Sequence, residues 1–414
     1  MVMPREERRD LFRSRVLRAI DGSVDMDDEH LRILIERIIR EYCRQEEPLT
    51  VDERRETKKD VFDSLRRLDV LQDLIEDSGV TEIMVNGPDA IFYERDGRLY
   101  QSNRHFHDRK RLEDVIQKIA AGVNRVINEA NPIVDARLPD GARVNAVLPP
   151  VSLSGAALTI RKFPKNRITM EALIGMGSIT EEAAEYLKVL VKAGYNIFVS
   201  GGTGVGKTTF LNVLSDFIPD NERIITIEDS AELQISNIPN LVRLEMRNAN
   251  VEGNHAVTIR DLIKTSLRMR PNRIIVGEVR DAASIDMLQA LNTGHTGMST
   301  RHSNSPADML SRIETMVLLG EEIPLLAVRK QMASAIDIII QLARFRDKSR
   351  RVTEIVEVVD CVNGEIVLNP LFTFEEEGED DNGNVIGRLR NLKHPLKKRG
   401  KLLAAGEAEC AAIM

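Results

Sequence analysis

The sequence lacks the features that mark several classes of protein. It contains no tryptophan, and only 4% of its residues are aromatic, so leucine, isoleucine, valine and methionine must form most of its cores. Its three cysteines lie far apart and without the spacing of metal ligands, which argues against a disulfide framework and fits a reducing compartment. The longest apolar stretch, near 333–343, is too short to cross a membrane and contains Asp337. Since 1–20 holds no apolar run of signal-peptide type, we expect a soluble protein of the cytoplasm.

What the chain does have is length and charge. Its 414 residues exceed a typical single domain, so two or three domains are expected. Apolar residues make up 42% of the chain, which is enough for several cores, and 30% of the residues are charged. The formal net charge of -7 argues against a general nucleic-acid coat, and no direct nucleic-acid contact is expected.

The first part of the chain predicts two small domains. Residues 1–66 are charge-rich and show helical periodicity, with Thr50 as a helix cap and Glu53 three residues later, so we expect a helical domain. Residues 67–165 alternate apolar and polar side chains between turn signals, with one helix at 109–127. Helix and strands together predict a compact α+β domain.

The second part predicts a parallel sheet covered by helices. A polar, glycine-rich stretch at 166–178 is typical of a linker. Helical patterns then alternate with short apolar strands in a domain that we place at 179–372 and that ends in a predicted hairpin. Those strands are expected at 196–200, 223–229 and 273–278. The acidic and basic runs of 373–414 predict a charged, flexible tail.

The stretch "GGTGVGKTT" predicts a phosphate-binding loop. The pattern G-x4-G-K-T runs from Gly201 to Thr208 without a gap, between a predicted strand and a predicted helix. Backbone N–H groups and the helix N-terminus would hold phosphate oxygens, Lys207 would neutralise the β and γ phosphates, and the Thr208 hydroxyl would complete the shell of Mg²⁺. The residues expected to bind the nucleotide are Gly201, Gly202, Thr203, Gly204, Val205, Gly206, Lys207, Thr208 and Thr209.

The loop alone leaves the nucleotide and its purpose open. A GTPase would carry an [NT]KxD motif after the loop, whereas "TKKD" at 57–60 lies before it in a charged helix, which we interpret as coincidence. A small-molecule kinase would leave the long N-terminal region without a purpose.

Acidic residues follow two of the predicted strands. The strand that ends in Gly277 and Glu278 would bring Glu278 to the carboxyl edge of the sheet, and Gly277 would leave room for a ligand there. A carboxylate at that edge can orient water, or hold Mg²⁺ through water. The preceding strand offers Glu228, Asp229 and Glu232, each of which could instead cap a helix or lie on the surface.

Two histidines follow in a stretch dense in glycine, serine and threonine, which predicts a loop near a strand end. A neutral imidazole at His295 or His302 could bond the γ-phosphate, although a lone histidine is more often structural. Without nearby cysteine or acidic ligands, the pair makes a poor zinc site.

Together these motifs resemble those of a known family. The phosphate-binding loop, "IEDSAEL", "GEVRD" and "TGHTGMSTRHSNSP" stand in the order of the Walker A, Asp box, Walker B and His box blocks of the secretion-superfamily ATPases. "VTEIMVNGPDAIFYERDGRL" and "DARLPDGARVNAVLPPVSLSGAALTIRKF" look like the CpaF/TadA branch, which powers tight-adherence (Flp) pili. The resemblance, from about 60 to 372, implies an α/β class fold: a RecA-like P-loop domain preceded by a PAS-like α+β domain and a small helical domain.

The resemblance also implies roles for residues. Glu278 would be the catalytic glutamate, and Glu228 and Glu232 would assist metal or water. His302 would lie near the γ-phosphate.

Two arginines before the linker match those that the family uses to complete its site. Arg143 and Arg161 would stabilise charge on the transferring phosphoryl group and couple hydrolysis to domain motion. Ordinary surface charge is the alternative for both.

The chain departs from the family pattern at two points. Seven positions separate His295 from His302, one fewer than in many members. Arg301 stands where a small or apolar residue is more usual, and we expect it to reach a neighbouring subunit or to face solvent.

The favoured hypothesis is a homo-hexameric ring that binds ATP and Mg²⁺ and pushes on an inner-membrane platform protein of a pilus or secretion system, meeting the membrane only through such partners. The alternatives are a conjugative or effector-translocating type IV secretion motor, a type II motor, and a nucleotide-sensing scaffold that hydrolyses little. A type II motor would usually carry a tetracysteine module, which three scattered cysteines do not form. A nucleic-acid translocase is weaker because the chain is acidic.

Overall fold

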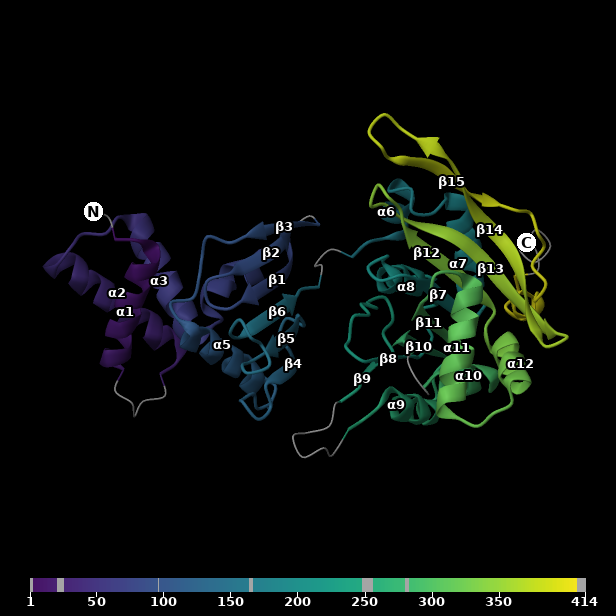
Figure 1. Ribbon diagram of the computed structural model, residues 1–414, viewed down its shortest axis with the longest axis horizontal. Coiled ribbons are helices and arrows are strands. Elements are labelled where there is room, and N and C mark those ends of the chain that lie inside the picture. Colours follow the sequence, from purple (N-terminus) through teal and green to yellow (C-terminus); the bar gives the residue numbers. More distant parts are fainter. Residues whose placement is uncertain are drawn as a thin grey trace. The chain divides into compact units, whose positions relative to one another are not determined.

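The chain folds into two units. The structure is a computed structural model that describes residues 3–20, 26–95, 97–163, 167–247, 256–279 and 283–407. The units are Met1–Asn166 and Arg167–Met414, so the chain divides at the start of the predicted linker (Figure 1). Within the described ranges, no helix is long and apolar enough to cross a membrane.

The first unit begins with three helices whose apolar faces meet. Leu31 lies on such a face and packs in one core with Phe12 and Val61 from the two other helices. The predicted cap at Thr50 is present as a capping box, in which the Thr50 side chain accepts from the Glu53 N–H and the Glu53 side chain accepts from the Thr50 N–H. The helices are α1 (Arg5–Ala19), α2 (Asp28–Gln45) and α3 (Val51–Arg66).

The rest of the first unit is an antiparallel sheet with helix α5 (Arg109–Gly122) packed on it. The strand order is β3-β2-β1-β6-β5-β4. Alternate residues such as Ile83, Val144 and Ile160 point into a core that they share with Ile116 of α5, as the period of two predicts. The remaining elements are η1 (Asp69–Leu71), α4 (Gln72–Glu76), β1 (Val80–Asn86), β2 (Ile91–Arg95), β3 (Arg98–Gln101), β4 (Ile133–Arg137), β5 (Arg143–Val147) and β6 (Ala157–Arg161).

The second unit is built on a nine-stranded sheet in the order β15-β14-β13-β12-β7-β11-β10-β8-β9. The strands from β12 to β9 in this order run parallel, and those from β12 to β15 pair antiparallel. The three strands predicted from the sequence are β7, β8 and β10. The strands are β7 (Ile197–Gly201), β8 (Ile224–Glu228), β9 (Leu241–Glu245), β10 (Arg273–Glu278), β11 (Thr296–His302), β12 (Ile338–Arg344), β13 (Arg350–Val362), β14 (Glu365–Glu379) and β15 (Val385–Asn391).

Helices cover both faces of this sheet, which gives the α/β, RecA-like class expected. Along β7, Ile197 and Val199 join a core with α7 and α8, whereas Phe198 joins the core on the other face with α9 to α12. Helices α10, α11 and α12 lie side by side (Figure 1). The helices are α6 (Met170–Gly175), α7 (Glu181–Lys192), α8 (Lys207–Ser215), α9 (Ile259–Ser266), η2 (Leu267–Met269), α10 (Ala283–Asn292), α11 (Pro306–Gly320), α12 (Leu325–Ala335) and α13 (Gly400–Ala404).

The prediction of a flexible tail at 373–414 is wrong as far as residue 407, where the structure describes it. β14 continues to residue 379 and pairs with β15, and Arg390 forms an ion pair with Glu375 across the two strands. Further on, the buried carboxylate of Glu357 accepts the backbone N–H of Lys397 at 2.9 Å. The charges that suggested a solvated tail therefore hold the outer strands and the C-terminal segment to the sheet.

Candidate nucleotide site

Four neighbouring parallel strands of the second unit end at one edge of the sheet. In the order β8, β10, β11 and β7, they carry Glu228, Glu278, His302 and Gly201 at their last positions. The register places His302 directly beside Gly201 and pairs β10 with β8 up to Val276 and Ile227. Motifs that lie 24 to 101 positions apart in the sequence thus meet at the carboxyl edge, where open α/β sheets bind ligands.

The loop after β7 has the backbone that a phosphate-binding loop requires. Gly201 has φ +156°, and a Cβ there would lie 2.6 Å from the carbonyl oxygen of Leu342 and 2.7 Å from Val205 Cγ2, so no larger residue fits. Gly206 is left-handed, with φ +92°, and forms the N-cap of α8, whose first N–H groups are thereby available for an anion. The Val205 side chain is buried, so this predicted binding residue can offer only its backbone.

The remaining predicted binding residues follow the loop's shape. Thr203 and Gly204 are exposed at its tip. Thr208 and Thr209 lie in the first turn of α8 and are half-buried. A threonine hydroxyl in this turn suits a Mg²⁺ ion that keeps several of its waters, as P-loop sites require.

Lys207, His302 and Glu278 form a connected series of side chains. The Lys207 ammonium donates to the Gly202 carbonyl at 2.7 Å and to His302 Nδ1 at 3.1 Å. The ammonium also lies 3.5 Å from His302 Nε2, and Nε2 faces Glu278 Oε1 at 3.7 Å. A lysine, an imidazole and a carboxylate thus converge beside the loop.

An irregularity in β10 sets the position of Glu278. The pairing of β10 with β11 shifts register between Val276 and Glu278, where Glu278 pairs with Thr300. The Thr300 hydroxyl donates to the Gly277 carbonyl at 2.6 Å. Such a bulge re-aims the side chain that follows it, and bulges are frequent beside active sites.

Glu228 fills the space that we expected Gly277 to leave for a ligand. A Cβ on Gly277 would lie 3.0 Å from Glu228 Cγ. Glu228 is 2% exposed, and its Oε1 accepts the backbone N–H of Glu232 at 2.7 Å and of Leu233 at 2.8 Å. Oε2 has no hydrogen-bond partner within the described ranges. Burial raises the pKa of Glu228 to about 7, since the backbone donors only partly offset the loss of water. Glu232 itself is half-buried in the loop after β8.

Two expectations about the histidine stretch are wrong. What we predicted as a loop is the central strand β11, bonded to strands on both sides, and only His295 lies in the turn before it. Arg301 does not face solvent, because it is 2% exposed and donates to the carbonyl of Val279 and to Met316 Sδ. Small polar residues in a buried strand look like a loop in the sequence, because the sequence does not show the hydrogen bonds that they form in the fold.

The two predicted arginines lie together in the first unit. Arg143 on β5 and Arg161 on β6 are cross-strand partners. Arg161 is exposed and Arg143 half-buried. Two guanidinium groups on adjacent strands make a cationic patch that can bind an anion.

The sequence did not predict two residues that reach the site from β12 and β13, on the side of β7 opposite β11. Arg350, the first residue of β13, donates from Nε to the Gly204 carbonyl at 2.9 Å. Gln341 of β12 donates to the Ser303 carbonyl at 3.3 Å, just after His302. No motif marks either residue, since strand order alone brings them to the site.

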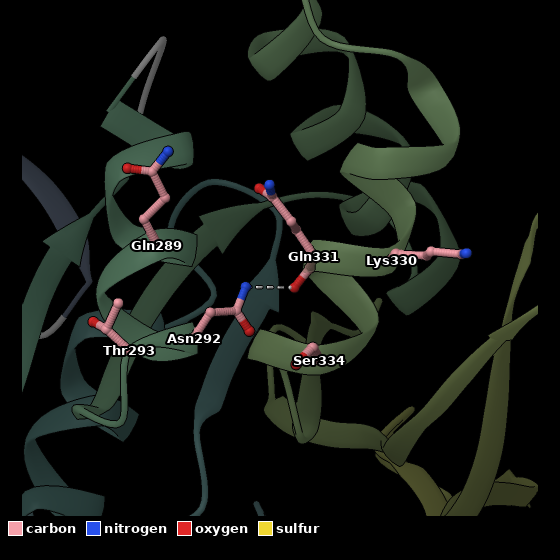
Figure 2. Close-up of a pocket in the computed structure, with 6 residues that line it drawn as sticks. All are labelled: Gln289, Asn292, Thr293, Lys330, Gln331 and Ser334. Atoms are coloured by element: carbon pink, nitrogen blue, oxygen red, sulfur yellow. Dashed lines mark hydrogen bonds between the residues drawn. The ribbon is translucent and has the colours of Figure 1, made fainter.

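A separate polar pocket of about 410 Å³ lies between α10 and α12 (Figure 2). It is lined by Gln289, Asn292, Thr293, Lys330, Gln331 and Ser334. Across it, Asn292 Nδ2 donates to the Gln331 carbonyl at 3.1 Å (Figure 2). None of the predicted site residues lines it.

A P-loop on a central parallel strand, with a histidine at the end of the adjacent strand β11 and a glutamate at the end of β10 beyond it, defines a P-loop NTPase of RecA-like fold. Residues 65–378, more than half of the chain, match the family model described as type II/IV secretion system protein. The chain belongs to this family of secretion ATPases and is an ATPase.

Relatives and solved structures agree with this class. The chain is 38% identical over 293 residues to a putative conjugal transfer protein of Mycobacterium tuberculosis, which covers 69% of this chain and 83% of that protein. It is 32% identical over 315 residues to the type IV secretion system protein PtlH homolog of Bordetella bronchiseptica, covering 70% and 93%. The fold is similar to that of the pilus retraction motor PilT with bound ADP, at a TM-score of 0.52 and 19% identity, covering 83% of this chain and 88% of that chain.

Proposed function

We propose that this chain is a ring motor at the cytoplasmic face of the membrane, which converts ATP hydrolysis into movement of a pilus or secretion machine. The observation that carries the proposal is the series Lys207–His302–Glu278 beside the P-loop. Glu278 acts as the base that orients the attacking water, and His302 forms a hydrogen bond with the γ-phosphate next to it. Lys207 leaves the Gly202 carbonyl and binds the phosphates.

Metal and arginines complete the proposed site. Thr208 would hold Mg²⁺, which would neutralise charge on the phosphates. Glu228 holds the loop after β8 by accepting the backbone N–H groups of Glu232 and Leu233, and the Glu232 carboxylate would assist metal or water. Arg143 and Arg161 bring positive charge from the preceding domain when that domain closes over ATP, and the repeated closure in six subunits is the mechanical stroke.

The test is ATP hydrolysis by purified wild type and Glu278→Gln, with molar mass measured by light scattering in the same buffer. We expect turnover to fall at least about 100-fold, because the base is lost while the shape is kept. The mass of the nucleotide-bound protein should correspond to six subunits. A monomer whose turnover is the same in wild type and in Glu278→Gln would contradict the motor and favour the nucleotide-sensing scaffold.

For the cargo, the sequence stretches that resemble the CpaF/TadA branch favour assembly of a Flp-type pilus through a membrane platform protein. A second cargo is favoured by the relatives, which are named for conjugal transfer and for type IV secretion. Deletion of the gene, complemented by wild type or by Glu278→Gln, separates the two. Loss of surface pili with normal DNA transfer supports the pilus, and the reverse supports the conjugative motor.

A further inference from the structure

The turn between β12 and β13 presents an arginine to the tip of the P-loop. Arg344 and Arg350 are the paired residues that close this hairpin. Only Arg350 reaches the loop, where its Nε donates to the Gly204 carbonyl at 2.9 Å. Its Cδ lies 3.7 Å from the position that a Cβ on Gly206 would take, so its side chain passes directly over the N-cap of α8.

Arg350 keeps unused donors at this position. It is exposed, and its two terminal nitrogens have no hydrogen-bond partner in the part of the chain that the structure describes. A guanidinium group carries five N–H donors in a planar fork that matches phosphate oxygens. The first N–H groups of α8 attract anions to the same place.

Two cations therefore rest on carbonyl oxygens of one loop. Lys207 donates to Gly202 and Arg350 donates to Gly204, two residues further on. A hydrogen bond from a cation to a phosphate oxygen adds the attraction between opposite charges, which a neutral carbonyl does not supply. When phosphates occupy the loop, both cations gain by turning toward them.

The hairpin turn holds Arg350 in place. The Asp347 carboxylate accepts the backbone N–H of Ser349 at 2.8 Å and of Val385 at 2.9 Å, which fixes the turn to the start of β15. Arg351, the next residue after Arg350, donates back to the Val385 carbonyl at 2.7 Å. These bonds fix the backbone of the turn, so Arg350 is presented beside the loop.

We propose that Arg350 binds the phosphate chain of the nucleotide with its terminal nitrogens, as a second cation beside Lys207. The proposal rests on the proposed function only in taking the P-loop as the nucleotide site. It adds a binding residue from β13, outside the motif blocks, and gives the strands that follow β12 a role in nucleotide affinity.

The experiment is calorimetric titration of the full chain with ATP and, separately, with inorganic tripolyphosphate, which has phosphates but no base or ribose. The variants are Arg350→Gln, Arg350→Lys and, as a matched control from the same hairpin, Arg344→Gln. We expect Arg350→Gln to lower the affinity for both ligands about tenfold, because a charge-assisted contact is lost. Arg350→Lys should recover part of that affinity, and Arg344→Gln should bind as wild type does.

The salt dependence of binding shows whether Arg350 binds the anion or only holds the shape of the loop through its bond to Gly204. Raising the salt concentration should weaken ATP binding less in Arg350→Gln than in wild type, since one screened charge is gone. Parallel salt responses, equal affinities, or a loss confined to ATP would each overturn the proposal. Wild type that binds neither ligand would instead refute the proposed function.

Discussion

At the scale of single residues, the site depends on contacts that leave no spare volume. Gly277 and Glu228 show this, because they lie on neighbouring strands and one fills the space that the other leaves. The sequence predicts Glu228 as a site residue and Gly277 as a position that leaves room for a ligand, but their contact follows only from strand order. The same holds for Arg350, which is 146 positions from its partner Gly204.

Gly277→Ala should lower the free energy of unfolding by about 1–3 kcal/mol, because the new Cβ would press on Glu228 Cγ. Urea unfolding measures the change. The control is the double variant Gly277→Ala with Glu228→Ala, in which the pressed atom is absent and the two effects should not add. Full additivity would show that the two residues do not press on each other.

Glu228 predicts a pH dependence of stability. Its pKa in the folded chain is about 7, above its ordinary 4.5, so between these values the folded state binds more protons than the unfolded state. Stability from this group is therefore present at low pH and is lost as pH rises toward 7, by about 3 kcal/mol in all. Glu228→Gln, neutral at every pH, should remove this loss. The free energy of unfolding of wild type and of Glu228→Gln is measured in urea at pH 5 and at pH 8. If the two proteins differ by the same amount at both pH values, the raised pKa is ruled out.

At the scale of elements, hydrophobic periodicity predicted the strands and helices that bury their own apolar residues. β7, β8 and β10 and the cap of α3 were predicted because local pattern determines them. β11 and β15 were not, because small polar and charged residues interrupt their apolar pattern. A sequence shows such charges but not their partners.

The C-terminal segment offers a test at this scale. Glu357 is fully buried and accepts the backbone N–H groups of Lys397 and Lys398 as well as the side chain of Asn369. Glu357→Ala should cost about 3 kcal/mol, since these donors lose their acceptor. Hydrogen exchange should rise at Lys397 and Lys398. Glu354→Ala, on the same strand but half-buried, serves as the control, and equal exchange in both variants would contradict the anchoring role.

At the scale of the whole molecule, the residues proposed for catalysis are divided between two units. Arg143 and Arg161 belong to the first, and Lys207 and Glu278 to the second. Charge delivered by a moving domain acts on the reaction more than on the bound ground state.

Arg143→Gln or Arg161→Gln should therefore reduce turnover at least about 100-fold while changing ATP affinity less than about threefold. Steady-state hydrolysis and equilibrium titration measure the two quantities. Arg98→Gln, on the exposed edge strand β3, is the control. Equal losses of turnover and affinity would place the arginines in binding alone.

The register of β11 also limits how the chain can change length. His302 faces Lys207 because five consecutive residues of β11 pair with β7, so one inserted residue within that run would turn every later side chain to the opposite face. A deletion there would act in the same way. The turn before Thr296, where Gly294 has φ +98°, imposes no such condition. An insertion at the junction between that turn and β11, after His295, would therefore change the spacing of the two histidines while the register that places His302 beside Lys207 is kept.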